Sequence, residues 1–424
     1  MDKQTATQLI GNTFNYPFDE GRFRNFAINL LNNVDEAKRF DYISGTYIRH
    51  SFKNHISKYK RLGTYTDPNG DKIDVLVVQL KNEWALERSR TMLRNFTSDY
   101  LKNRDEKDAA LVAYYTSNPE DWRFSYIKME YKRVQTESGK FKIKEDVTPA
   151  KRYSFLVGKN EPNHTAQAQL VGILADDRNN PTLTELETAF SVDAVTKQFY
   201  KDYRAQFEKL WNELNDIVSK DHKISAEFES KTIDTANFAK KLMGQIVFLY
   251  FLQKKGWLGV GKDSEGNFKD WGTGPKNFLR RLYDKEFTDY GNFFNDILEP
   301  LFYEALATER TSDVFTQFNC KIPFLNGGLF EPINDYNWEE TDIRIDNDII
   351  ASVLGTFDQY NFTVREDEPL EKEVAVDPEM LGKVFENLLP ENLRKGKGTY
   401  YTPRTIVHYM CQESLINYLD TECE

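Results

Sequence analysis

The chain has 424 residues, of which 40% are hydrophobic and 14% aromatic, and it carries a formal net charge of −11. This length predicts two or three domains, and the composition excludes a disordered chain. Three widely spaced cysteines without a C-x-x-C pair, no signal-peptide organisation at the N-terminus and no apolar run of about 18 residues together predict a soluble, cytoplasmic protein that does not contact a membrane.

Charge is distributed unevenly along the chain. Residues 1–160 contain 28 Lys and Arg against 21 Asp and Glu, a net of +7, whereas residues 161–424 contain 28 against 46, a net of −18. A basic first third on an acidic chain predicts that contacts with nucleic acid are concentrated there. Ordinary scatter of surface charge is the alternative interpretation.

A helix and a β-hairpin are the first predicted elements. Residues 19–32 place Phe and Leu at helical spacing after Asp19, the predicted N-cap. Residues 59–65 and 73–80 flank a turn that contains Pro, Asn and Gly, which is typical of a β-hairpin.

The elements that follow predict an α/β domain. Residues 83–101 have helical periodicity, residues 108–115 are an apolar run of buried-strand length, and residues 122–134 and 141–145 are predicted strands. The order helix, hairpin, helix, strand, hairpin predicts a mixed sheet with flanking helices, in a domain that ends near residue 175.

The end of the predicted hairpin suggests a PD-(D/E)xK nuclease site. Such sites hold Mg²⁺ with two or three carboxylates and orient the attacking water with a lysine. Gln79-x-Lys81 is a glutamine variant of the usual acidic-x-Lys pair. The catalytic candidates are Glu20, Asp74, Gln79 and Lys81. Of these, Asp74 and Gln79 are the candidate metal ligands. Strand alternation points Asp74 away from Gln79 and Lys81, so a bulge would be needed to bring the set together. A nuclease-like fold that contacts DNA without cutting it is the alternative.

From about residue 183 the pattern predicts a mainly α-helical connector domain. Apolar residues recur three and four apart over residues 183–190, 193–214, 236–254, 277–284 and 292–307. Within this region, residues 248–252 are hydrophobic around much of a helix, and their helix is predicted to be the central, buried member. Residues 256–262 have the spacing of a phosphate-binding loop, but a helix precedes them and Asp263 follows, so we interpret them as a helix stop.

The last part of the chain is predicted to contain a capped helix. Residues 377–389 are a helix candidate, and a basic link leads from them to Thr402 and Pro403, an N-cap and a first-turn proline. Backbone N–H groups at such a helix start attract an anion, although an ordinary capped helix is the simpler interpretation. The stretch LGKVFENLLPENLRKGKGTYYTPRTIVHYM resembles the entry to the N6-adenine DNA methyltransferase domain of type IIG restriction-modification proteins.

This resemblance covers most of residues 14–419 and implies further properties. Tyr400, Tyr401, Thr402 and Pro403 match family positions that help to hold the amino-acid end of S-adenosylmethionine. The resemblance also implies a nuclease domain in the first part of the chain, double-stranded DNA as substrate and Mg²⁺ for any cleavage. The glycine-rich Asp-Pro-x-x-Gly-x-Gly turn and the Asn-Pro-Pro-aromatic tetrapeptide of the family are absent from the sequence. We therefore expect that the chain does not methylate DNA alone, and that S-adenosylmethionine binds only if a second chain or a longer protein supplies the missing core.

These inferences combine into one predicted organisation. We expect a nuclease-like α/β domain over residues 1–175, a helical connector over residues 176–390, and the N-terminal edge of an adenine methyltransferase domain over residues 391–424. The whole would be the N-terminal part of a type IIG-like restriction-modification protein. A non-catalytic DNA-binding or protein-interaction module from a truncated or split protein is the alternative.

Overall fold

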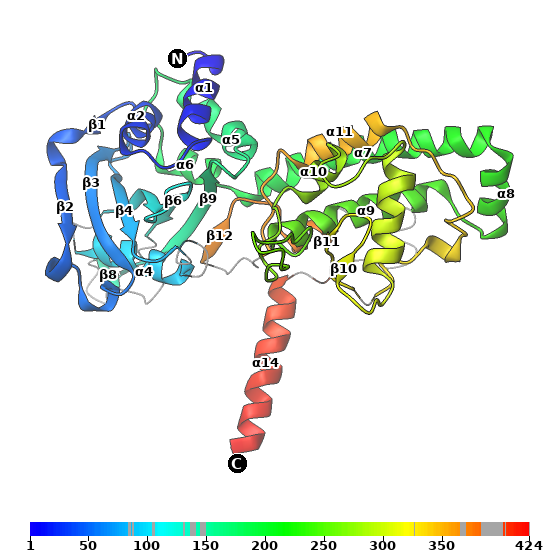
Figure 1. Cartoon of the computed structure of the whole chain (residues 1–424). Helices are drawn as coiled ribbons and strands as arrows, with labels where there is room; N and C mark the ends of the chain where they lie inside the picture. Colours follow the sequence, from blue (N-terminus) through cyan, green and yellow to red (C-terminus); the bar gives the residue numbers. More distant parts are fainter. Residues whose placement is uncertain are drawn as a thin grey trace. The chain divides into compact units, whose positions relative to one another are not determined.

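The computed structural model describes residues 1–83, 86, 89–103, 107–129, 132–135, 141–144, 150–325, 327–364, 370–382, 402 and 404–423. Contacts between residues divide the chain into two compact units, residues 1–376 and residues 377–424 (Figure 1). The first unit contains a β-sheet with flanking helices and a helical region. The predicted division near residues 175 and 390 stays a prediction.

A mixed sheet forms the centre of the first part of the chain. Its strands are ordered β1–β3–β4–β5–β6–β9–β12, and β2 also pairs with β3. The pairs β4–β5 and β9–β12 are parallel and the other pairs are antiparallel, which confirms the predicted mixed sheet. The bounds are β1 Val34–Asp35, β2 Phe40–Ser44, β3 Ile56–Thr66, β4 Lys72–Leu80, β5 Ala109–Tyr115, β6 Asp121–Lys128, β9 Lys151–Gly158 and β12 Glu371–Glu373.

The predicted hairpin is confirmed by the antiparallel pairing of β3 with β4. Its turn is held by Asp67, whose carboxylate accepts hydrogen bonds from the backbone N–H groups of Asn69 (2.8 Å) and Asp71 (2.9 Å). The predicted strand 122–134 is wrong in its length, because the structure divides it into β6 and β7, and β9 was not predicted. Among the described residues, two further pairs of strands lie outside the main sheet: β7 Lys132–Gln135 with β8 Phe141–Lys144, and β10 Val314–Phe315 with β11 Cys320–Lys321.

One face of the sheet is covered by helix α4, Arg90–Lys102. Its residues Leu93, Phe96 and Tyr100 belong to one buried cluster with Leu76 and Val78 of β4. These strand residues have even numbers, so the even-numbered side chains of β4 face α4.

The opposite face is covered by aromatic residues of the N-terminal helices. The ring of Phe14 lies 5.5 Å from that of Trp122 between centroids, and the rings of Phe23 and Phe26 contact Phe124. Helices α1 and α5 were not predicted, whereas α2 and α6 confirm the predicted segments 19–32 and 183–190. The bounds are α1 Lys3–Phe14, α2 Glu20–Leu31, α5 His164–Leu174 and α6 Leu183–Ala189.

Helices dominate the chain from α7 onward, which confirms the predicted helical character of this region. Helix α9 is its central member, since Leu249 and Tyr250 are buried with most of their helix. The predicted helix 292–307 instead contains two π-helical segments, Phe294–Leu298 and Pro300–Leu306. The other bounds are α7 Val192–Lys220, α8 His222–Ser230, α9 Thr235–Lys254, α10 Phe278–Tyr283 and α11 Asn347–Phe357, with short 3-10 helices at Glu36–Lys38, Gly45–Tyr47, His50–Phe52 and Ile333–Asp335.

Strand β12 returns from the helical region to the edge of the sheet, where it pairs with β9. Its two carboxylates enter a buried cluster of guanidinium groups: Glu373 pairs with Arg90 and lies 3.5 Å from Arg123, and Glu371 lies 3.5 Å from Arg152. Burial alone would raise the pKa of Glu373, but Arg123 and Arg90 lower it to about 2. The segment at the end of the first unit is therefore bound to the sheet by charge as well as by backbone pairing.

In the second unit, the carboxylate of Asp377 accepts a hydrogen bond from the backbone N–H of Met380 at 2.8 Å. Residues 378–382 begin the helix predicted over residues 377–389, and residues 383–390 lie outside the described part of the chain. Helix α14, Arg404–Cys423, confirms the helix predicted after Pro403. Among the described helices of both units, none is long and apolar enough to cross a membrane, and the cytoplasmic location stays a prediction.

Candidate functional site

Asp74, a predicted metal ligand, lies on the α4 face of the sheet and is fully buried. Its carboxylate accepts hydrogen bonds from Thr64 Oγ1 (2.6 Å), Tyr100 Oη (2.8 Å) and Arg61 Nη1 (3.1 Å). Burial alone would lower the pKa of Arg61, but the charge of Asp74 raises it above its usual value. These partners make Asp74 part of the packing between β3, β4 and α4.

Gln79 occupies the other face of β4. It lies opposite Lys58 on β3 and opposite Tyr115 on β5. The residues of β4 follow one another without interruption, and the extra residues that shift the pairing belong to β3. The prediction that Gln79 and Asp74 point to opposite faces is therefore confirmed, and no bulge of β4 brings the two together.

Glu20 reaches the face of Gln79 from the first turn of α2. Asp19 caps this helix by accepting a hydrogen bond from the backbone N–H of Arg22 at 2.8 Å. The Glu20 carboxylate pairs with Lys60 Nζ and accepts a hydrogen bond from Tyr42 Oη at 2.9 Å. The helix start thus fixes one acidic side chain over the sheet.

Two lysines and two tyrosines complete this face. The Nζ atoms of Lys58 and Lys60 lie 4.1 and 4.7 Å from the ring centroid of Tyr42. The hydroxyl groups of Tyr42 and Tyr115 are 3.4 Å apart, and burial raises the pKa of both. We refer to the set Glu20, Tyr42, Lys58, Lys60, Gln79 and Tyr115 as the Tyr42 face.

Lys81 directly follows β4 and is exposed. Its backbone N–H donates to the carbonyl oxygen of His55 at 2.9 Å, which continues the pairing of the hairpin. Continued alternation would direct its side chain to the same side as Gln79. The structure therefore brings Glu20 and Gln79 to one face, adds Lys81 at its edge and separates Asp74 from them.

This arrangement does not fit a magnesium ion. Mg²⁺ requires oxygen ligands in near-octahedral geometry, usually from carboxylates. On the Tyr42 face the carboxylate of Glu20 is engaged by Lys60 and Tyr42, and two ammonium groups would repel a divalent cation. Among the described residues, no group of three His, Cys, Asp or Glu side chains could hold a metal ion.

The predicted S-adenosylmethionine contacts fall largely outside the described residues. Tyr400, Tyr401 and Pro403 are not among them, and Thr402 is exposed. Their predicted role stays a prediction.

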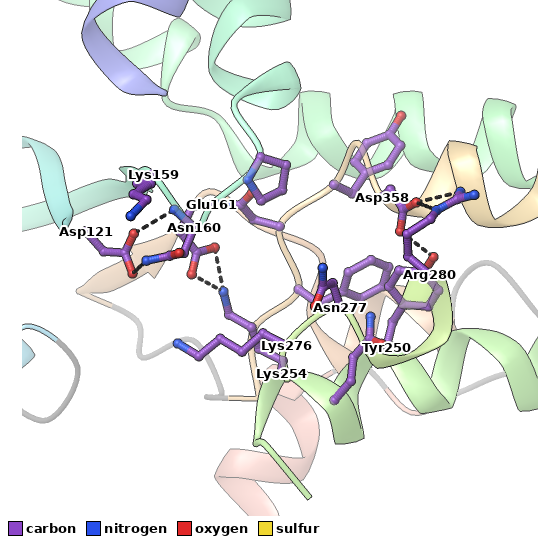
Figure 2. A pocket seen from close by; sticks show the side chains of 15 residues that line it. Asp121, Lys159, Asn160, Glu161, Tyr250, Lys254, Lys276, Asn277, Arg280 and Asp358 are labelled. Carbon is purple, nitrogen blue, oxygen red and sulfur yellow. Dashed lines mark hydrogen bonds and ion pairs between the residues drawn. The ribbon is translucent and has the colours of Figure 1, made fainter. Parts of the chain in front are cut away.

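A cavity of about 620 Å³ lies where β6 and β9 meet α9, α10 and the segment after α11 (Figure 2). Its wall contains ion pairs: Lys254 Nζ lies 2.5 Å from both carboxylate oxygens of Glu161, and Arg280 lies 2.7 Å from Asp358. The carboxylate of Asp121, also on the wall, accepts a hydrogen bond from the backbone N–H of Asn160 at 3.0 Å. The Lys254–Glu161 pair joins the end of the sheet to the helical region, whereas the Arg280–Asp358 pair lies within the helical region.

Two further groups on the cavity wall have unused bonding capacity. Asn361 donates from Nδ2 to the carbonyl oxygen of Leu156 at 2.7 Å, but its buried Oδ1 has no hydrogen-bond partner in the described part of the chain. Lys276 is exposed and makes no ion pair with the described residues. Sequence reasoning missed this cavity, because its residues come from segments up to about 240 positions apart and share no motif.

Part of the chain is similar in sequence to a known protein. Over 251 residues the chain is 33% identical to a protein of Methanocaldococcus jannaschii provisionally named as a type II restriction enzyme and methyltransferase. The match covers 53% of this chain and 19% of the relative, so the chain spans about a fifth of that protein's length. No family model matches the chain, and no solved structure matches it. The predicted resemblance to restriction-modification proteins of the type II kind is confirmed.

Proposed function

We propose that the chain is the N-terminal part of a type IIG-like restriction-modification protein that acts on double-stranded DNA, and that its first domain contacts DNA phosphates with the Tyr42 face without cutting them. The observation that carries this proposal is the composition of that face. Lys58 and Lys60 stand beside Gln79, which takes the place of the acidic residue in the acidic-x-Lys pair. A nuclease-like scaffold with this composition offers positive charge to a phosphate and little to a metal ion.

The physical basis is the release of counterions from DNA. Each phosphate that a lysine neutralises makes the logarithm of the affinity fall by about 0.9 for each tenfold rise in salt concentration. Lys58 Nζ contacts the ring of Tyr42, whereas Lys60 also forms an ion pair with Glu20. Substitution of Lys58 therefore removes a positive charge without breaking that ion pair, so Lys58 is the better residue to test.

The experiment measures binding of a fluorescent DNA duplex to the full chain at several salt concentrations. We expect Lys58→Ala to weaken binding and to reduce the salt slope by about 1. The matched control is Lys220→Ala, which removes an exposed lysine that pairs with Asp216 at 2.5 Å on α7. Equal losses for the two variants, or no binding by the unmodified chain, would contradict the proposal.

Cleavage of DNA with Mg²⁺ by Glu20, Asp74, Gln79 and Lys81 is the second candidate function. In its favour, Glu20 and Gln79 share one face and Lys81 follows the same strand. Supercoiled plasmid incubated with the chain and Mg²⁺ separates the two candidates. Nicking that is abolished by both Lys81→Ala and Glu20→Gln would establish this second function and overturn the non-catalytic role. Under the first proposal, plasmid stays intact.

S-adenosylmethionine binding by residues 400–403 is proposed from the resemblance alone, together with a methyltransferase core supplied by a second chain or a longer protein. Equilibrium dialysis tests it. We expect the chain alone not to retain S-adenosylmethionine, and the chain combined with such a core to retain it. Loss of that retention in Tyr401→Ala would support the role of this segment.

A further inference from the structure

The loop between α9 and α10, residues 255–276, has an unusually constrained backbone. Gly256 has φ of +68°, and its carbonyl oxygen accepts hydrogen bonds from the backbone N–H groups of Gly272 (3.1 Å) and Gly274 (2.9 Å). A Cβ atom on Gly256 would lie 2.4 Å from the Gly272 oxygen. The backbone segments around Gly256 and Gly272 therefore approach too closely for a side chain at position 256. We refer to this segment as the glycine-linked loop.

This fixed backbone exposes two tryptophans. Trp257 and Trp271 flank the contact between Gly256 and Gly272 and are 38% and 39% exposed. An exposed tryptophan in an isolated position needs no explanation, but two beside one rigid contact form an apolar surface held in place.

A lysine ammonium group lies over each of the two tryptophan rings. Lys255 Nζ lies 4.6 Å from the ring centroid of Trp257, and Lys321 Nζ lies 5.4 Å from that of Trp271. Lys321 comes from β11 and is held by a hydrogen bond to the carbonyl oxygen of Lys269 at 3.1 Å. The aromatic surface is thus combined with positive charge from two separate parts of the chain.

The local charge is opposite to that of the surrounding sequence. Residues 255–276 contain four lysines against three acidic residues, whereas residues 161–424 as a whole carry a net charge of −18. At the end of the loop, Lys276 reaches the wall of the cavity of about 620 Å³. An anionic partner is therefore favoured at this loop and disfavoured over most of the helical region.

We propose that the glycine-linked loop binds unpaired nucleotides of DNA, with bases stacked on Trp257 and Trp271 and phosphates beside Lys255, Lys276 and Lys321. Stacking on a tryptophan requires the flat face of a base, which paired duplex DNA does not present. The inference rests on the proposed action on DNA and extends it: the Tyr42 face contacts the duplex, and this loop contacts nucleotides that have left it. A peptide partner would use the same apolar rings without the lysines.

The test compares a fluorescent oligothymidine of about 20 nucleotides with a duplex of the same length, each bound to the full chain. Base stacking on one aromatic side chain is worth roughly five- to 160-fold in affinity. We expect Trp257→Ala and Trp271→Ala each to weaken oligothymidine binding by about tenfold, with partial recovery in Trp→Phe variants, and to leave duplex binding unchanged. Binding should also quench tryptophan fluorescence less in each Ala variant than in the unmodified chain.

The matched control is Trp211→Ala. Trp211 lies on α7, is 37% exposed and donates from its indole N–H to Thr235 Oγ1 at 3.1 Å. If Trp257→Ala and Trp271→Ala bind oligothymidine as strongly as the control Trp211→Ala, the inference is wrong. The proposed function would still stand in that case if duplex binding depends on Lys58. If the chain binds neither DNA, the proposed function fails together with the inference.

Discussion

Burial of Glu299 should make the stability of the helical region depend on pH in an unusual direction. Glu299 lies between the two π-helical segments and is fully buried. One oxygen accepts a hydrogen bond from Tyr336 Oη at 2.5 Å, and Tyr336 Oη in turn lies 3.0 Å from Tyr303 Oη. The other oxygen of Glu299 has no hydrogen-bond partner among the residues that the structure describes. Loss of hydration raises the pKa of Glu299 from 4.5 to about 9. The carboxyl group is therefore protonated at neutral pH in the folded protein.

The sign and size of the effect follow from these two values. Below pH 4.5 the group is neutral in both the folded and the unfolded chain, and between pH 4.5 and about 9 only the unfolded chain ionises it. The free energy of unfolding should therefore fall by about 1.4 kcal/mol per pH unit across this window. At pH 8 the accumulated loss is about 4–5 kcal/mol.

The substitution Glu299→Gln removes this titration while keeping an oxygen that can accept the hydrogen bond from Tyr336. We expect the variant to be less sensitive to pH and more stable than the unmodified chain at pH 8, as measured by urea unfolding followed by circular dichroism at pH 6 and pH 8. Glu309→Gln, which changes an exposed glutamate beyond the second π-helical segment, is the control and should change neither value. A Glu299→Gln variant that is destabilised at pH 8, or that keeps the same pH dependence, would refute the reasoning.

Three further substitutions test other parts of the fold by urea unfolding. Glu373→Gln leaves buried guanidinium groups without a counter-charge and should cost about 3 kcal/mol at pH 7; because the pKa of Glu373 is lowered to about 2, its stabilisation is present above pH 4.5 and the two proteins should converge as the pH falls toward 2. Asp74→Asn should also cost about 3 kcal/mol and leave duplex binding unchanged, and a loss of DNA binding without a loss of stability would instead support its predicted role as a metal ligand. Gly256→Ala should destabilise by more than about 1 kcal/mol because of its positive φ and the short contact that a Cβ would make, whereas Gly172→Ala in α5, where a Cβ meets no atom within 4 Å, should be neutral or stabilising.

Local patterns in the sequence predicted most of the elements around the Tyr42 face. The hairpin of β3 and β4 follows from two strand-like segments and a Pro-Asn-Gly turn, and α2 follows from its spacing and the cap at Asp19. Strand alternation alone also separated Asp74 from Gln79, because side chains of one uninterrupted strand must alternate between its faces. The resemblance to restriction-modification proteins could likewise be recognised from the sequence alone.

Other features could not be predicted, since they depend on which distant segments meet. The residues next to Glu20 in the sequence do not predict that its carboxylate will bind Lys60 and Tyr42. The residues next to Glu373 do not predict that β12 will pair with β9. Helix α1 was missed although its buried residues Ala6, Ile10 and Phe14 recur at helical spacing.

The sequence by itself therefore determined the hairpin, the helical region and the kind of protein that the chain resembles, because these depend on residues close together or on motifs read in order. The tertiary structure alone decided which charges meet: that Asp74 is enclosed by Arg61 and Tyr100, that Glu20 is paired with a lysine, and that Lys254 and Glu161 join the sheet to the helices. The free energy of an ion pair depends on distance and burial, and neither quantity can be read from separation along the chain.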